Sequence, residues 1–340
     1  MKIGLIGSTG NIGKYLLSSL ILQNEHELYL ITRSKRSKFE SIQNIKQEIS
    51  GSIEDDETLI KLINKENALD LLFLCLPQAF DHEQMLNVGK KIGDLCKLND
   101  INTIIRISSF GIDNNSVKFD SSNTQGLLGD AHVAIETYYT NELGLETHSV
   151  RPTSFFTNLL YNLEELEQTS WSSISTPLSN SKEAIVNWVS CKDIAGVTNK
   201  IIQNINNSTY SSNSSNSNPL LHVYDVMGGA ENTLSADDIC KLIDTVKKEK
   251  ESTIFSTLSS SSSSNSSNNS SNNSTGESKC KYNYVSPPPV EAYEQLWSFL
   301  QKGGFNCNSN FNSSGSGNTV KEMTGQVPAS LKTYIAELMK

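Results

Sequence analysis

Three glycines near the start of the chain have the spacing that a bound dinucleotide requires. The segment Gly7-Ser-Thr-Gly10-Asn-Ile-Gly13 follows an apolar run and opens a helical pattern. Gly7 would permit a tight turn, Gly10 would let the backbone approach a pyrophosphate, and Gly13 would let the helix pack against the strand. The helix N-terminus would then present N–H groups and partial positive charge to the phosphates. The pattern predicts dinucleotide binding; the alternative is a glycine-rich turn without a ligand.

The residues after the second predicted strand distinguish NADP from NAD. NAD-binding proteins usually carry Asp or Glu there, which accepts a hydrogen bond from the ribose 2′-OH. This chain instead has Arg33-Ser-Lys-Arg36, followed by Lys38. An arginine at this place can pair with a 2′-phosphate through charge-assisted hydrogen bonds. We therefore predict NADP(H), read by Arg33, with NAD(H) as the alternative; a solvated basic loop is the other interpretation.

The elements that position these residues alternate between strand and helix. Apolar runs predict buried strands and 3.6-residue periodicity predicts helices. In the first half we expect strands at 2–7, 27–32, 69–76, 102–107 and 146–150, with helices at 11–23, 54–64, 81–98 and 128–143. This alternation predicts an α/β fold, a Rossmann-type doubly wound parallel sheet.

The second half is less regular. There we expect strands at 184–190 and 220–226 and helices at 155–166, 193–204, 236–249, 290–302 and 329–339. Asp193 is a candidate N-cap, and Ser235 with Asp238 resembles a capping box. Two segments rich in Ser and Asn, at about 207–218 and 250–279, are predicted to be disordered surface loops. We predict a dinucleotide-binding domain at 1–152 and a smaller, irregular α+β part at 153–340, which would bind substrate or a partner.

Composition excludes several classes of protein. The 340 residues carry a net charge of −9, which argues against a direct nucleic-acid binder. No apolar run reaches the length of a membrane span, so no membrane association is expected. The six cysteines are far apart in sequence and show no zinc-ligand spacing, so we expect no metal site. Reduced thiols are typical of the cytoplasm, which is the predicted location, with the nucleus as alternative.

Several further motifs, in order, make the chain resemble the NmrA-like family of the short-chain dehydrogenase/reductase superfamily. They are GSTGNIG, Leu74-Cys-Leu-Pro77, Arg106-Ile-Ser-Ser109, Gly129-Asp-Ala-His132-Val-Ala-Ile-Glu136, Arg151-Pro-Thr-Ser-Phe155-Phe-Thr-Asn158, Ser190-Cys-Lys-Asp193-Ile-Ala and Thr324-Gly-Gln-Val-Pro328. The segment around His132 is most similar to the quinone-oxidoreductase-like branch.

The resemblance implies a cofactor site along one edge of the sheet. Ser8, Thr9, Gly10, Asn11 and Ile12 would hold the pyrophosphate, Arg33 the 2′-phosphate, Ser52 and Ile53 the adenine rim, Leu76, Pro77 and Gln78 the ribose, and Phe155, Phe156, Thr157 and Asn158 the nicotinamide side. His132 would lie close to the nicotinamide ribose and is a weak catalytic candidate; a surface histidine is the alternative.

The catalytic pair of the superfamily is missing. A Tyr-x-x-x-Lys pair would place both groups on one helix face, where the lysine lowers the pKa of the tyrosine. No tyrosine of this chain has a lysine four residues later. Two hypotheses follow: a redox-responsive NADP(H)-binding regulator with a protein partner, or an NADPH-dependent oxidoreductase acting on quinones or similar small acceptors.

Other residues have two readings each. Ser108 and Ser109 could be catalytic or could cap a turn, Glu136 could orient His132 or form an ion pair, and Arg151 could pair with a phosphate or with a carboxylate. Cys75 and Cys191 would be redox sensors only if they were exposed and of low pKa.

Overall fold

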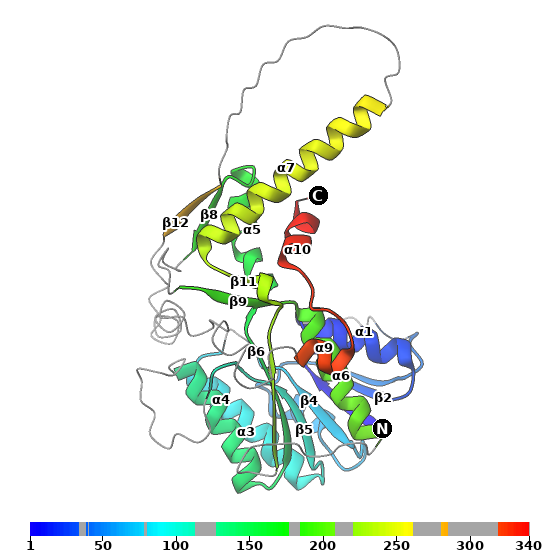
Figure 1. The fold of residues 1–340 in the computed structure, drawn as a ribbon. Helices are drawn as coiled ribbons and strands as arrows, with labels where there is room; N and C mark the ends of the chain where they lie inside the picture. Colours follow the sequence, from blue (N-terminus) through cyan, green and yellow to red (C-terminus); the bar gives the residue numbers. More distant parts are fainter. Residues whose placement is uncertain are drawn as a thin grey trace, which may run out of the picture.

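A seven-stranded, all-parallel sheet forms the lower body of the molecule in Figure 1. Its order is β3-β2-β1-β4-β5-β6-β10, so the chain reverses direction across the sheet between β1 and β4. The computed structural model describes residues 1–33, 39, 41–77, 80–112, 127–176, 184–207, 220–260, 280–284 and 319–339. The predicted α/β, doubly wound fold is confirmed.

The elements of this body follow the predicted alternation closely. They are β1 (Lys2–Ile6), α1 (Gly13–Gln23), β2 (Glu27–Thr32), β3 (Ile45–Ser50), α2 (Asp56–Leu62), β4 (Leu71–Leu74), α3 (His82–Leu98), β5 (Thr103–Ile107), α4 (Leu127–Thr137), a π-helical turn (Tyr138–Glu142), β6 (Glu146–Pro152), α6 (Cys191–Asn206), β10 (Leu221–Val226) and α9 (Thr319–Thr324). The last strand of the sheet, β10, therefore comes from residues after the predicted domain boundary at 152. The division of the chain into two domains at that boundary stays a prediction.

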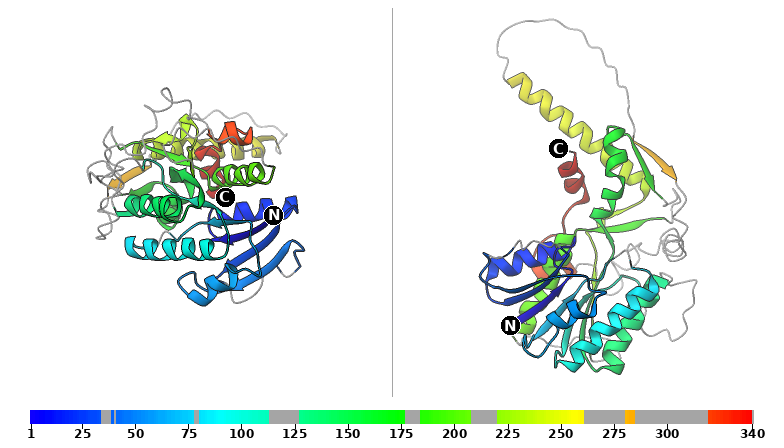
Figure 2. Two further views of the ribbon diagram at one scale, coloured as in Figure 1. Left: turned by 90° about the horizontal axis from the view of Figure 1, so that it is seen from below. Right: turned by 180° about the vertical axis from the view of Figure 1, so that it is seen from behind.

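Two apolar layers hold the sheet between helices. One face packs against α1, α6 and α9, and the other against α2, α3 and α4 (Figure 2). The central strands β1 and β4 are buried on both faces, which explains why their sequences are apolar without alternation. Edge strand β3 was not predicted, because its sequence IKQEIS is mostly polar and only Ile49 is buried.

A second, smaller body lies above the sheet in Figure 1. It contains β7 (Ser154–Phe155), a 3₁₀ segment (Phe156–Asn162), α5 (Leu163–Gln168), β8 (Ser173–Thr176), β9 (Val186–Val189), a 3₁₀ turn (Ala230–Asn232), β11 (Thr233–Leu234), α7 (Ala236–Ser260), β12 (Lys281–Tyr284) and α10 (Leu331–Leu338). Strands β11, β9 and β7 form one small sheet, and β12 pairs with β8. These elements enclose their own apolar core.

Several predictions in the second half need correction. The predicted helix 155–166 is a 3₁₀ segment followed by a single short α-helix. The N-cap of α6 is Ser190, whose hydroxyl accepts from the Lys192 N–H, and Asp193 instead accepts from the N–H of Ala329 at 2.7 Å. Helix α7 continues to Ser260, through the start of the segment predicted as a loop.

Two further predictions differ in outcome. The capping box at the start of α7 is confirmed, because Ser235 and Asp238 exchange side-chain to backbone hydrogen bonds. The predicted helix at 290–302 and most of both Ser/Asn-rich segments lie outside the described residues. In the part of the chain that the structure describes, no helix is long and apolar enough to cross a membrane.

Candidate functional site

The glycine turn between β1 and α1 can only be built from glycine at two of its three glycine positions. Gly7 has a φ of 85°, and a Cβ there would lie 2.5 Å from the carbonyl oxygen of Cys75. A Cβ on Gly13 would lie 2.0 Å from the carbonyl oxygen of Gly7. A Cβ on Gly10 would lie 3.3 Å from the Gly7 carbonyl oxygen, a tight contact that requires a shift of a few tenths of an ångström.

The N-terminus of α1 is left open. Its N-cap is Ile12, which offers no side-chain cap, and the first turn contains no acidic residue. Helix α3 shows the opposite solution, since Asp81 and Gln84 form a full capping box there. Backbone N–H groups in the first helical turn have no intrahelical acceptor, and they lie at the positive end of the helix dipole. An anion is the group that this helix end would accept best.

Some residues of the turn are buried and hold it in place, and the others are exposed. Ser8 is buried, and its hydroxyl lies 3.5 Å from the carbonyl oxygen of Ile31 as a donor. Ile12 is buried in the core, so only its backbone can face a ligand. Thr9, Gly10 and Asn11 are exposed. The turn is thus held at its two ends and open between them.

The other predicted cofactor residues lie after the carboxyl ends of neighbouring strands. Arg33 is exposed and follows β2. Ser52 is exposed and Ile53 half-buried after β3, and Leu76 and Pro77 are half-buried after β4. Parallel strands end at one edge, so these residues share an edge with the glycine turn. Gln78 lies outside the described residues.

The segment after β6 places its four predicted residues differently from one another. Phe155, Thr157 and Asn158 are half-buried, whereas Phe156 is buried in the upper core and its ring lies 5.6 Å from that of Tyr334. Asn158 donates to the hydroxyl of Ser154 at 3.0 Å, and the Thr157 hydroxyl lies 3.6 Å from the Cys191 sulfur. Core packing thus accounts for Phe156.

A buried ion cluster occupies the same edge of the sheet, between β5, β6 and α4. Glu136 lies between two arginines: Arg151 Nη2 donates to Oε2, and Arg106 Nη1 lies 3.2 Å from Oε1. The Ser108 hydroxyl also donates to Oε1 at 2.6 Å, and Arg151 donates to the Ile112 carbonyl at 3.1 Å. All four side chains are buried. Both Glu136 and Arg151 had an ion pair as one of their two predicted roles, and the structure shows that ion pair.

The cluster fixes the protonation state of Glu136. Burial alone would raise the pKa of this carboxyl. The charges of Arg151 and Arg106, with hydrogen bonds from Arg151 and Ser108, outweigh burial and lower the pKa to about 2. Glu136 is therefore a carboxylate at neutral pH.

His132 belongs to the same cluster, one helical turn before Glu136 on α4. Arg106 donates to its carbonyl oxygen at 2.9 Å and lies 2.8 Å from its Nδ1. A guanidinium can only donate, so Nδ1 accepts and the ring proton lies on Nε2. Burial and the Arg106 charge lower the pKa of His132 to about 3. At neutral pH the ring is thus neutral, a hydrogen-bond donor through Nε2 and not an imidazolium acid.

Two further residues carry roles that sequence reasoning did not assign. Arg106 is the centre of the ion cluster; its signal was a charge inside the apolar run TIIRI, which demands a buried partner. Asn187 is buried on β9, accepts from the Gly228 N–H at 2.8 Å and the Thr153 hydroxyl at 2.9 Å, and donates to Thr233. It ties the upper body to the ends of β6 and β10, and no local pattern revealed it.

Neither candidate redox cysteine has a reactive environment. Burial raises the pKa of the Cys75 thiol to about 12. The Cys191 thiol is buried as well, and burial raises its pKa above the ordinary value. Thiolates are the reactive form, so these raised pKa values disfavour reactivity of both thiols at neutral pH.

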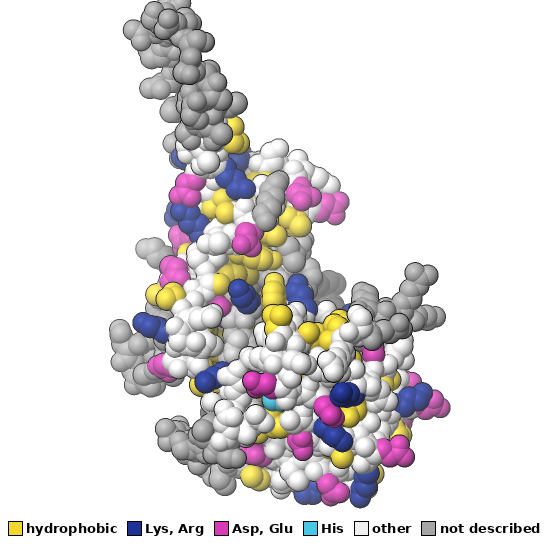
Figure 3. Space-filling model, turned by 90° about the vertical axis from the view of Figure 1, so that its right-hand side faces the viewer, with side chains coloured by type: hydrophobic (Ala, Val, Ile, Leu, Met, Phe, Trp, Pro, Cys, Tyr) yellow, Lys and Arg dark blue, Asp and Glu magenta, His cyan; other side chains and the backbone are white. Residues whose placement is uncertain are grey.

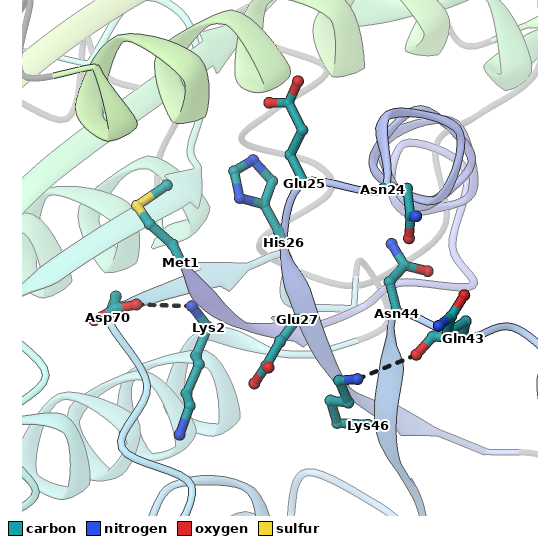
Figure 4. Close-up of a pocket in the computed structure, with 10 residues that line it drawn as sticks. All are labelled: Met1, Lys2, Asn24, Glu25, His26, Glu27, Gln43, Asn44, Lys46 and Asp70. Atoms are coloured by element: carbon teal, nitrogen blue, oxygen red, sulfur yellow. Dashed lines mark hydrogen bonds between the residues drawn. The ribbon is translucent and has the colours of Figure 1, made fainter.

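A cavity of about 460 Å³ lies at the other edge of the sheet, at the amino ends of β1, β2 and β3. Figure 4 shows its lining, with the Lys2 N–H donating to Asp70 and Lys46 to the Gln43 carbonyl. In open α/β sheets, ligands bind outside the carboxyl ends of the strands. This cavity is therefore separate from the glycine turn. Figure 3 shows positive and negative side chains interspersed on one face of the molecule, without a basic stripe.

Comparison with known proteins agrees with this architecture. The model of the NmrA-like family matches residues 1–255. No curated protein matches the chain. Among solved structures, an NADPH-dependent quinone oxidoreductase from Escherichia coli in complex with NADPH has a TM-score of 0.63 at 12% identity, covering 100% of both chains.

Two other solved structures are similar to the same degree. Triphenylmethane reductase from Citrobacter sp., in complex with NADP(H), has a TM-score of 0.66 at 14% identity and covers 99% of each chain. The negative transcriptional regulator NmrA, in complex with NADP, has a TM-score of 0.62 at 14% identity and covers 99% of this chain and 95% of its own. The three neighbours share the fold and differ in their described roles.

Proposed function

The chain belongs to the NmrA-like family, and on that premise we propose that it binds NADP(H) at the glycine turn and acts as a redox-responsive regulator. The turn fits a pyrophosphate on the observations of this structure. Cβ atoms are excluded at Gly7 and Gly13, Gly10 is exposed, and the first turn of α1 has neither a side-chain cap nor an acidic residue. Structural neighbours that carry NADP(H) support the same cofactor.

In this proposal different residues bind different parts of NADP(H). The backbone from Ser8 to Ile12 binds the pyrophosphate, and Arg33 binds the 2′-phosphate. Ser52, Ile53, Leu76, Pro77 and Gln78 surround the adenine and its ribose. His132, Phe155, Thr157 and Asn158 lie on the nicotinamide side. The second part of the chain, 153–340, contacts a regulatory protein partner, in the cytoplasm or alternatively in the nucleus.

One observation carries the regulatory role: the ion cluster contains no proton donor suited to neutral pH. His132 and Glu136 are spaced i, i+4 on α4, as a catalytic Tyr and Lys would be. Glu136 is already ionised and His132 is neutral, with pKa values of about 2 and about 3. General acid catalysis works best with a pKa near the working pH. Both side chains are instead used to hold β5, β6 and α4 together.

An NADPH-dependent oxidoreductase acting on quinones or similar small acceptors is the second candidate. Bound NADPH would supply a hydride, and reduction of a quinone needs little acid catalysis from the protein. The neutral His132 could donate a hydrogen bond from Nε2 to an acceptor oxygen, and water would supply the one proton that completes the hydroquinone. The quinone and dye reductases among the structural neighbours favour this candidate.

One titration series separates the two candidates. The purified full-length protein is titrated with NADPH and with NADH by nicotinamide fluorescence, and a panel of quinones is then added while NADPH oxidation is followed. We expect micromolar NADPH binding, weaker NADH binding and no steady oxidation. Steady oxidation of NADPH by a quinone, if Gly10→Asp abolishes it, would contradict the regulator hypothesis and support the reductase hypothesis. Absence of binding to either dinucleotide would contradict both.

A further inference from the structure

Two histidines and a glutamate meet at the amino end of β6 and β10. Glu146 and His148 are two residues apart on β6 and so lie on one face of the sheet, and His222 on β10 pairs in register with His148. Glu146 Oε1 lies 3.2 Å from His222 Nε2 and 3.7 Å from His148 Nε2. Of the described residues, these three form a group whose ligand atoms all lie within 4.8 Å of one another.

The two separations from Glu146 are close to those between ligand atoms of a tetrahedral metal site. Zinc binds histidine nitrogen at about 2.0–2.1 Å and carboxylate oxygen at about 2.0–2.2 Å, so neighbouring ligand atoms lie about 3.4 Å apart. The two measured separations from Glu146 fall on either side of that value. Two histidines and one carboxylate are also a common ligand set for catalytic zinc, with water in the fourth position.

Neighbouring groups orient the ligands. The Tyr224 hydroxyl lies 3.2 Å from His148 Nδ1, the ring nitrogen that faces away from Glu146. Metal-binding histidines commonly donate this second N–H to a nearby oxygen, which leaves the lone pair on Nε2 for the metal. Thr103 on β5 donates to Glu146 Oε2 at 3.4 Å, which leaves Oε1 to face both rings.

Burial leaves one side of the group accessible. The His148 and His222 side chains are 0% and 4% exposed, whereas that of Glu146 is 40% exposed. An ion would therefore enter past Glu146, and a water ligand would lie on that side. The two rings are stacked, 4.6 Å apart with 28° between their planes, so they must open for both lone pairs to converge.

We propose that Glu146, His148 and His222 bind a divalent transition-metal ion of the zinc class. The ion joins the outermost strand β10 to β6. It lies at the amino ends of these strands, whereas the glycine turn lies at the carboxyl end of β1, and water completes its coordination. Residues from two strands supply it, which is why no ligand spacing is visible in the sequence. The competing arrangement is a carboxylate that accepts hydrogen bonds from both ring N–H groups without a metal.

The test uses Co²⁺ and Zn²⁺ with the full-length, chelator-treated protein under reducing conditions. We expect one equivalent of Co²⁺ to give the visible absorption of a tetrahedral ion without a thiolate charge-transfer band, and Zn²⁺ to displace it. Calorimetry with Zn²⁺ should then show at least a tenfold loss of affinity in Glu146→Gln and in His222→Gln. Circular dichroism confirms that each variant is folded, and Glu146→Gln is the mildest of them.

His26→Gln is the matched control, because His26 is a buried histidine on a loop next to β2, and four strands separate β2 from β10. This variant should bind Zn²⁺ as the parent does. Absence of a one-equivalent site, a sulfur charge-transfer band, or equal affinity in the parent and both cluster variants would each overturn the proposal. NADPH binding is not involved in any of these readouts, so the test is independent of the proposed function.

Discussion

The glycine turn and the ion cluster lie at the same edge of one sheet and use their polar groups in opposite ways. At the turn, α1 begins without a side-chain cap and without an acidic residue, and the residues between its anchored ends are exposed. In the cluster, Glu136 is surrounded by Arg106, Arg151 and Ser108, and every one of these side chains is buried.

The difference shows which polar groups of this protein are available to bind a ligand. Donors that the fold does not use, at the positive end of a helix, remain available to an anion. Charges that neutralise one another inside the protein are not available to a reaction, because moving either partner would leave a buried charge without compensation. The unused donors therefore lie at the start of α1, whereas the charges of the ion cluster are already paired with one another.

Of the changes that we propose, disrupting the buried ion cluster should have the largest effect, and that effect is on the free energy of unfolding. Glu136→Ala leaves Arg106 and Arg151 buried without their carboxylate, and removing one partner of a buried pair costs about 3–5 kcal/mol. We expect a loss of that size in the free energy of unfolding, measured by urea denaturation. Glu57→Ala removes an exposed ion pair with Lys61 and serves as the control, with an expected change below about 0.5 kcal/mol. Equal stability of the two variants would show that the cluster does not hold the fold.

The next effect should come from closing the turn. In Gly13→Ala the Cβ would meet the Gly7 carbonyl at 2.0 Å, so the turn has to shift. A shift there moves the backbone that we propose binds the pyrophosphate, and we expect NADPH affinity to fall by about 100-fold or more, about 2.7 kcal/mol. Fluorescence titration measures it.

Gly196→Ala is the control for that substitution. Gly196 lies inside α6, where the nearest atom to a new Cβ is Thr324 Cγ2 at 3.5 Å. Alanine favours a helix interior, so stability should hold or rise slightly and NADPH binding should be unchanged. If Gly13→Ala binds NADPH as well as Gly196→Ala does, the turn is not the binding site.

A smaller effect should separate the two cofactors. Arg33→Asp replaces the proposed partner of the 2′-phosphate by a repelling charge, so NADPH affinity should fall about 10- to 100-fold, while NADH affinity changes little. Lys46→Asp makes the same change of charge on β3, beside the cavity at the opposite edge, and should affect neither (Figure 4). An equal loss for both dinucleotides in Arg33→Asp would show that Arg33 does not read the phosphate.

The sequence predicted the turn better than the cluster, for a physical reason. Gly7, Gly10 and Gly13 act within seven residues, and apolar strands such as β4 are recognisable wherever they occur. The cluster joins β5, α4 and β6, so the partner of Arg106 depends on tertiary packing. Edge strand β3 was missed because its sequence is mostly polar and only Ile49 is buried. Ser190 is the N-cap because α6 begins at Cys191, so Asp193 lies inside its first turn.

The smallest effect concerns pH and His132. Its pKa is lowered from 6.5 to about 3 in the folded state, so below pH 6.5 the unfolded chain binds a proton that the folded chain does not. Stability from this residue is therefore complete above pH 6.5 and decreases as the pH falls toward 3. Between pH 6.5 and 5 we expect its share to be about 1–2 kcal/mol.

The variant His132→Gln isolates this contribution. Glutamine does not titrate, so its free energy of unfolding should fall less steeply than that of the parent between pH 6.5 and 5. His26, whose pKa burial also lowers, titrates in both proteins and cancels in the comparison. Glu136 changes protonation only below about pH 4.5, where both proteins lose its contribution together. Parallel curves above that pH would mean that His132 can become charged in the folded protein, and the cluster would then contain an acid after all.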